Sequence, residues 1–279
     1  MTFKTILTVV TDAEEAAGQV DAAVDLARRE DAHLDILCIG IDQTQVGFYY
    51  AGASAILTQE AFDRAREDAG RLEQAIRERM AAEDIRWAVD SAVSQIGAIG
   101  GAVSMLARFS DLVVHRQPYG DSAGPVEEAI VEAALFEGRA PVLILPRKRA
   151  TIEFGKRIVV AWNQSDEALK AIRRALPLLK AAAFVDIAVI DPPTHGPERS
   201  DPGGMLSQML SRHGVRTEVS VLAKTLPRTS DVLLRHARDT AADLIVMGAY
   251  SHSRFREAIL GGTTRNMLEN AEIPIFTAH

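Results

Sequence analysis

The stretch DLIVMGAYSHSRFREAILGG (residues 243–262) decides how this chain folds. Its apolar run from Leu244 to Met247 predicts a buried strand that ends on Gly248. A short helix is predicted to follow, then a second glycine turn at residues 261–264 and a further helix that ends near Asn270. Glycines just past a strand let backbone N–H groups approach an anion, and a helix N-terminus adds partial positive charge. The two turns therefore form a candidate phosphate site; the alternative is that the glycines only permit tight turns.

The chain reads as two halves that carry the same elements in the same order. Each half has an opening strand, an alanine-rich helix, a second strand, a later apolar strand preceded by aspartate, and a proline-bearing closing strand. The sequence therefore predicts two domains, residues 1–148 and 154–279, joined by a basic and polar connector. The matched segments are 4–12 with 156–163, 16–29 with 165–180, 33–40 with 185–191, 110–114 with 242–246, and 140–145 with 273–276.

Within each half, short runs rich in valine, isoleucine and leucine alternate with helical patterns. Strands that are apolar throughout are typical of parallel sheets covered by helices on both faces. Right-handed crossovers then give an α/β fold of two tandem doubly wound parallel sheets. Ligands of such sheets bind beyond the carboxyl ends of the strands, where Asp12, Asn163 and Gly248 are expected. The closing strands are apolar enough that we expect them to be covered, by pairing with each other inside the chain; association of two chains is left open.

Composition excludes several classes of function. The chain has 279 residues and a net charge of −7, so it offers no basic surface for a nucleic-acid backbone. Its single cysteine, Cys38, excludes an intramolecular disulfide and lies in an apolar run that predicts burial. No histidine spacing suggests a metal site. No apolar stretch is long enough to span a bilayer and no leader pattern precedes the first strand, so a cytoplasmic location without membrane contact is expected.

One segment distinguishes the two halves. Residues 43–60 of the first half contain an aromatic cluster, and this segment has no counterpart in the second half. We expect this segment to be a flap or a loop that contacts a protein partner; the alternative is that its aromatic side chains pack on their own half.

Taken together, these motifs resemble those of the universal stress protein (UspA) family, and the chain resembles a tandem member with two adenine nucleotide alpha hydrolase-like domains. Nucleotide-binding members of that family carry an aspartate after the first strand and a Gly-x-x-Gly-x9-Gly-(Ser/Thr) motif after the fourth. In the second half this pattern starts at Gly248 and reaches Gly261 with the family's spacing. It departs at Ser251 in place of the second glycine, Gly262 in place of the hydroxyl residue, and Asn163 in place of the aspartate.

The resemblance implies an adenine nucleotide, ATP with Mg²⁺, bound by the second half. The site residues it implies are Asn163, Gly248, Ser251, Gly261, Gly262, Thr263 and Thr264. In the first half Asp12 is expected at the strand-end acid position, but Arg116 stands where the first glycine belongs and Pro118 removes a backbone donor. We therefore interpret the first half as degenerate for triphosphate binding.

No catalytic residue is predicted. His252 lies between two serines, but sequence neighbours seldom meet in the geometry of a nucleophile and its base. The acidic positions Glu127, Glu128 and Glu132 are interpreted as a solvated helix face. The predicted function is a cytoplasmic stress-response or signalling protein in which bound nucleotide acts as a switch, with slow ATP hydrolysis left open. The alternative is a nucleotide-independent interaction protein whose glycine turns are structural.

Overall fold

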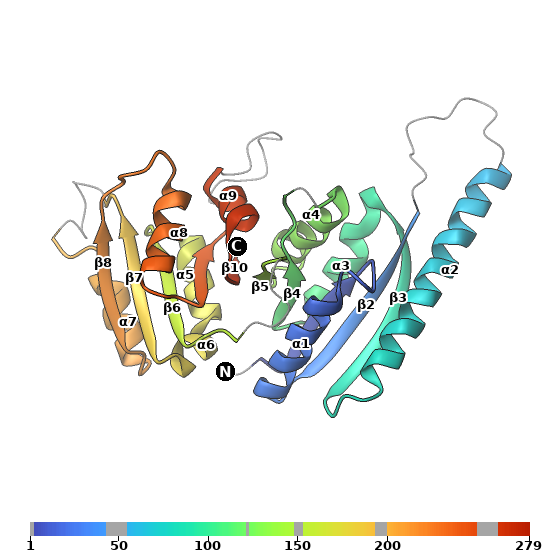
Figure 1. The fold of residues 1–279 in the computed structure, drawn as a ribbon, viewed down its shortest axis with the longest axis horizontal. Helices are drawn as coiled ribbons and strands as arrows, with labels where there is room; N and C mark the ends of the chain where they lie inside the picture. The colour runs from blue at the N-terminus through green and yellow to red at the C-terminus, as the bar shows by residue number, and fades with distance from the viewer. Residues whose placement is uncertain (1–2, 43–54, 121–122, 148–152, 193–199, 250–261) are drawn as a thin grey trace. The chain divides into compact units, whose positions relative to one another are not determined.

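The computed structural model describes residues 3–42, 55–120, 123–147, 153–192, 200–249 and 262–279, which fall into two compact units (Figure 1). The N-terminal unit contains Phe3–Pro118 and Ala123–Ala140. The C-terminal unit contains Pro141–His279 together with Tyr119 and Gly120. The strand that closes the first half of the sequence therefore belongs, by its contacts, to the C-terminal unit.

The N-terminal unit has a parallel sheet in the order β3-β2-β1-β4. Right-handed crossovers place α1 and α2 on one face of this sheet and α3 and α4 on the other. In chain order the elements are β1 (Thr5–Val10), α1 (Ala17–Glu30), β2 (His33–Asp42), α2 (Ala55–Met80), β3 (Arg86–Gln95), η1 (Ile96–Ala98), α3 (Ile99–Ala107), β4 (Leu112–Arg116), α4 (Pro125–Glu132) and η2 (Ala133–Glu137).

The C-terminal unit repeats this pattern in the order β5-β10-β9-β6-β7-β8. All neighbouring pairs are parallel except β5 with β10, which are antiparallel and align Leu143 with Phe276. In chain order the elements are β5 (Val142–Leu145), β6 (Arg157–Trp162), α5 (Asp166–Arg174), α6 (Leu176–Ala181), β7 (Phe184–Ile190), α7 (Gly204–Arg212), β8 (Thr217–Leu222), α8 (Thr229–Asp239), β9 (Leu244–Gly248), α9 (Gly262–Asn270) and β10 (Ile275–Ala278).

The predicted doubly wound α/β class is confirmed in both units, and so is the internal pairing of the closing strands. In each unit the chain first winds outward from the opening strand and then returns to its other side. The reversal falls between β1 and β4 in the N-terminal unit and between β6 and β9 in the C-terminal unit. These are the points at which open α/β sheets bind their ligands.

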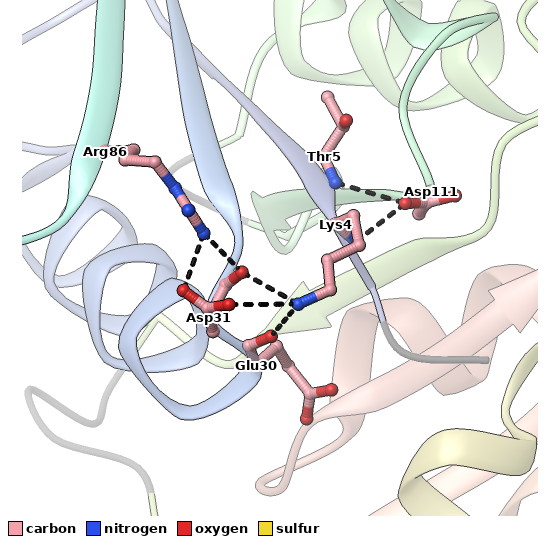
Figure 2. Close-up of polar contacts among 6 residues, drawn as sticks. All are labelled: Lys4, Thr5, Glu30, Asp31, Arg86 and Asp111. Atoms are coloured by element: carbon pink, nitrogen blue, oxygen red, sulfur yellow. Dashed lines mark hydrogen bonds and ion pairs between the residues drawn. The ribbon is translucent and has the colours of Figure 1, made fainter.

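A pair of aspartates explains why the sequence repeats before the fourth strand of each half. Asp111 Oδ2 accepts hydrogen bonds from the backbone N–H groups of Lys4 (2.7 Å) and Thr5 (3.1 Å), which Figure 2 shows at the start of β1. Asp243 does the same for the strand β6, accepting from the N–H groups of residues 155, 156 and 157 at 2.9–3.1 Å. Each aspartate therefore ties the start of the opening strand to the strand beside it.

A second polar cluster lies at the same amino end of the N-terminal sheet. Asp31, in the left-handed conformation at φ 50° after α1, pairs with Lys4 (3.2 Å) and Arg86 (2.6 Å). Figure 2 shows both cations directed at this one carboxylate. These charges lower the pKa of Asp31, the Lys4 hydrogen bond being the largest cause. The side chains are exposed, so the cluster fixes local geometry at the turn and contributes little to stability.

Two predicted boundaries differ from the structure. The single helix predicted over residues 165–180 is two helices, because Pro177 has no N–H to continue the first and lies in the first turn of α6. The segment 43–60 was expected to be a loop, but Ala55 already begins α2, and residues 43–54 lie outside the described residues. Predicted burial of Cys38 is confirmed at 0% exposure. In the parts of the chain that the structure describes, no helix has the length and hydropathy needed to cross a bilayer.

Candidate functional site

The candidate site lies where β6 and β9 run side by side at the carboxyl edge of the C-terminal sheet. Asn163 directly follows β6, and Gly248 is the last residue of β9. Because parallel strands end at the same edge, the two residues flank the reversal point of this sheet. Two of the predicted site residues, Ser251 and Gly261, lie outside the described residues.

Asn163 is exposed, and its side chain takes part in a turn. Its Oδ1 accepts a hydrogen bond from the backbone N–H of Ser165 at 3.2 Å. Ser165 in turn caps α5, because its Oγ accepts from the N–H of Ala168 at 3.1 Å. Asn163 therefore starts the turn that leads into α5.

Gly248 has a packing role that does not depend on any ligand. A Cβ placed at this position would lie 2.6 Å from the nitrogen of Ala168 and 2.7 Å from the carbonyl carbon of Glu167. Both are backbone atoms in the first turn of α5, so they cannot rotate away. The close approach of α5 to β9 requires glycine here, which supports the structural interpretation of this residue.

The N-terminus of α9 faces the same edge. Because β9 and β10 are parallel neighbours, the chain must return between them, and α9 starts its return at the carboxyl edge. The helix begins at Gly262, within the turn predicted over residues 261–264. Gly262 and Thr263 are exposed, whereas Thr264 is buried at 6%. No acidic side chain occupies this first turn, so its partial positive charge is not offset by a carboxylate of the turn itself.

Sequence reasoning missed His279 at this edge. The Nδ1 atom of His279 lies 3.0 Å from the carbonyl oxygen of Ala249, and β10 pairs Ala278 with Gly248. The adjacency of β9 and β10 was the signal that could have placed His279 beside the glycine. Arg265 stacks its guanidinium over the ring of Tyr119 at 4.7 Å, which directs this cation to an aromatic face.

Asp12, the acid expected at the end of the first strand of the N-terminal half, lies one residue beyond that position. The register pairs Ile6 with Leu112 and Ile158 with Leu244, so the counterpart of Asn163 is Thr11. Asp12 is one position further along. Its Oδ1 accepts from the N–H of Glu15 at 2.9 Å, and its side chain therefore shapes the turn before α1.

Arg116 and Glu127 form a buried ion pair that the sequence did not indicate. Arg116 ends β4 as Gly248 ends β9, and its Nη2 lies 2.8 Å from Oε1 of Glu127. The two side chains are 10% and 11% exposed, and Arg116 also pairs with Glu15. The interpretation of Glu127 as part of a solvated face was wrong, because the first turn of α4 lies against the end of β4.

The longer turn before α1 leaves room for this arginine. Residues 11–16 separate β1 from α1, whereas residues 163–165 separate β6 from α5. Gln19 of α1 fills part of the added space, since its Oε1 accepts from the N–H of Arg116 at 3.0 Å. Its Nε2 donates to the carbonyl of Val9 and to Oγ1 of Thr8, each at 2.8 Å.

The described residues at this edge give little support for metal binding. Among the described residues, no group of three or more histidine, cysteine or acidic side chains lies close enough to hold a metal ion. His252 lies outside the described residues. The remaining donors at the edge are backbone N–H groups, hydroxyls and an amide, which suit recognition of an anion and a sugar hydroxyl.

Comparison with known proteins fits this geometry. Residues 155–279 match the model of the universal stress protein family. Universal stress protein Slr1230 of Synechocystis sp. is 28% identical over 138 residues, which make up 49% of this chain and 46% of that protein. The match thus spans about half the length of that relative.

Two solved structures share the fold over nearly the whole chain. A universal stress protein from Archaeoglobus fulgidus superposes with a TM-score of 0.72 at 16% identity, covering 98% of this chain and 97% of that one. A putative universal stress protein from Pseudomonas aeruginosa gives 0.60 at 16% identity, covering 99% and 93%. At these identities the likeness concerns the fold.

The order of strands defines an α/β protein whose fold is similar to that of universal stress proteins over nearly the whole chain. Residues 155–279 match the universal stress protein family, and the chain as a whole is similar in fold to universal stress proteins. The resemblance noted from the glycine turns is thereby confirmed.

Proposed function

We propose that this chain is a cytoplasmic stress-response or signalling protein that binds an adenine nucleotide, ATP with Mg²⁺, at the carboxyl edge of the C-terminal sheet. The residues proposed to form the site are Asn163, Gly248, Ser251, Gly261, Gly262, Thr263 and Thr264. The observation that carries the proposal is the N-terminus of α9, which starts at exposed Gly262 on the same edge as Asn163 and has no acidic residue in its first turn.

The described residues suit such a ligand. Backbone N–H groups at the start of α9 would hold phosphate oxygens, and the helix dipole would add to their attraction. The amide of Asn163 would hydrogen-bond a ribose hydroxyl. Bound ATP would supply negative charge and a bridging Mg²⁺ at this edge. No catalytic residue is part of the proposal, so the ligand would act by shifting the equilibrium between conformations or partners.

The proposed domain division follows the sequence repeat, residues 1–148 and 154–279. The segment 43–60 is proposed to contact a protein partner, and no nucleic-acid or membrane partner is proposed. A phosphate-release assay over hours would measure any slow ATP hydrolysis.

Calorimetric titration of nucleotide-free protein with Mg-ATP tests the proposal. Saturable binding near one site per chain is expected, and Gly262→Val should weaken it at least tenfold by placing a branched side chain on the first turn of α9. The described part of the fold should tolerate this change, because among the described atoms a Cβ at Gly262 meets nothing closer than 4.0 Å. Gly101→Val is the matched control, since it alters an exposed helical glycine with open space in the other unit.

The alternative, a nucleotide-independent interaction protein, has a specific observation in its favour. Gly248 is required by the approach of α5, and the Asn163 side chain serves a turn, so both residues have roles without a ligand. Absence of both heat and any ATP-dependent thermal shift would refute nucleotide binding and favour this alternative.

A further inference from the structure

The helix before the closing strand begins differently in the two halves of the chain. In the first half this helix is α4, and in the second it is α9. The third helical residue is Glu127 in α4 and Thr264 in α9. The residue at the end of the preceding strand also differs, being Arg116 in one half and Gly248 in the other.

Glu127 places a carboxylate at the N-terminus of its own helix. Its Oε2 accepts from the N–H of Gly124 at 3.0 Å, and its Oε1 accepts from Arg116 at 2.8 Å. Burial raises the pKa of Glu127, but hydrogen bonds from its own N–H, Arg116 and Gly124 outweigh burial and hold the pKa below its ordinary value. The side chain is therefore an anion at neutral pH, seated where helix N-termini attract anions.

Arg116 completes this arrangement from the strand. Its guanidinium pairs with Glu127 and Glu15, and its backbone N–H is bonded to Gln19. In the second half, glycine and threonine at the matching positions supply no charge. At these two described positions the halves thus differ in charge: the first half has an anion and a cation, and the second has a glycine and a threonine.

We propose that Glu127 is a built-in anion that closes the first half to phosphate-bearing ligands, and that the third residue of this helix decides which half accepts one. A phosphate approaching α4 meets a carboxylate of like charge and finds the N–H groups of Gly124 and Glu127 already bonded to that carboxylate. At α9 the same position is a neutral threonine. The choice of phosphate as the ligand rests on the proposed function, whereas the closure of the first half rests on the ion pair alone.

Removal of the built-in anion provides a test that does not need ATP. Glu127→Ala empties the carboxylate position and leaves Arg116 and the helix N–H groups facing it. Inorganic phosphate, compared with chloride at equal ionic strength, should then raise the Tm of this variant by about 3 °C at ten times its Kd. The wild type and Glu128→Ala, the matched control on the same helix, should show a smaller shift. An equal shift in all three proteins would overturn the proposal.

The reverse substitution tests the second half. Thr264→Glu should bind Mg-ATP at least tenfold more weakly than Thr264→Gln, because the two side chains are similar in size and only glutamate adds an anion to the first turn of α9. Equal affinity of these two variants would overturn the proposal. Circular dichroism checks their folding, and if either fails to fold, the phosphate experiment on Glu127→Ala decides alone. If the wild type binds no Mg-ATP, the proposed function fails while that experiment still tests the closure.

Discussion

Substitution of Gly248 by alanine tests whether packing fixes this residue. The added methyl group would lie 2.6 Å from the nitrogen of Ala168 and 2.7 Å from the carbon of Glu167, where about 3.5 Å is the ordinary contact between heavy atoms. Since both neighbours are backbone atoms, relief requires α5 to move away from β9. Overpacking of this kind costs about 1–3 kcal/mol, and the entropy that alanine removes from the unfolded chain offsets about 0.5 kcal/mol of it.

The expected result is a lower free energy of unfolding in the C-terminal unit, with a fall in Tm of about 3 °C for each kcal/mol. The chain has two tryptophans, Trp87 in β3 and Trp162 in β6, one in each unit. In a Trp87→Phe background, fluorescence during urea unfolding reports Trp162 alone. The assay therefore follows the unit that contains the substitution.

Gly101→Ala serves as the control because an added Cβ there meets no atom of the described residues within 4 Å. It lies in α3, where alanine in place of glycine should stabilise by about 0.5–1 kcal/mol. If Gly248→Ala proved as stable as the wild type, the close approach of α5 would not be what requires glycine, and the packing argument would be refuted.

Three further results are expected. Burial raises the pKa of the Cys38 thiol to about 12, so a thiol reagent at pH 8 should label the native protein far more slowly than the urea-unfolded protein; equal rates would show that the thiol is accessible. Ser165→Ala should cost about 1 kcal/mol in urea unfolding, because it removes the hydrogen bond that caps α5, and an unchanged midpoint would contradict that role. Glu127→Gln should cost about 2–4 kcal/mol at pH 7. Folding lowers the pKa of Glu127, so its carboxylate stabilises the fold at pH values above the ordinary pKa of 4.5 and loses that effect as the pH falls through the folded pKa. The difference in unfolding free energy between the wild type and the variant should therefore shrink on acidification. A difference that grows instead would show that the pKa is raised on folding.

The sequence by itself determined the fold class and the repeat. Apolar strands such as Leu244–Gly248 are buried on both faces, and that requirement appears directly as continuous runs of valine, isoleucine and leucine. The aspartates before β4 and β9 also stood out in the sequence, because each performs the same local task at the start of the opening strand. Features governed by local chemistry and burial could therefore be predicted.

The candidate site was predictable only in part. Its position followed from the order of strands, because the reversal between β6 and β9 brings Asn163 and Gly248 to one edge. The reason for the glycine did not follow, since it depends on how closely α5 approaches β9. A one-residue error at Asp12 arose because only the register with β4 shows which residue ends the strand.

Only the tertiary structure decided that the first half has a buried ion pair at the carboxyl edge of its sheet. In the sequence Arg116 is a departure from a motif and Glu127 is one of three acidic residues on a helix. They are eleven positions apart and come from different elements, so no local pattern predicts that they meet. The fold brings the end of β4 against the first turn of α4, and burial then makes a neutralising partner necessary for both charges. Long-range contacts of this kind depend on loop lengths and helix positions. These cannot be read from a local sequence pattern and become visible only in the folded chain.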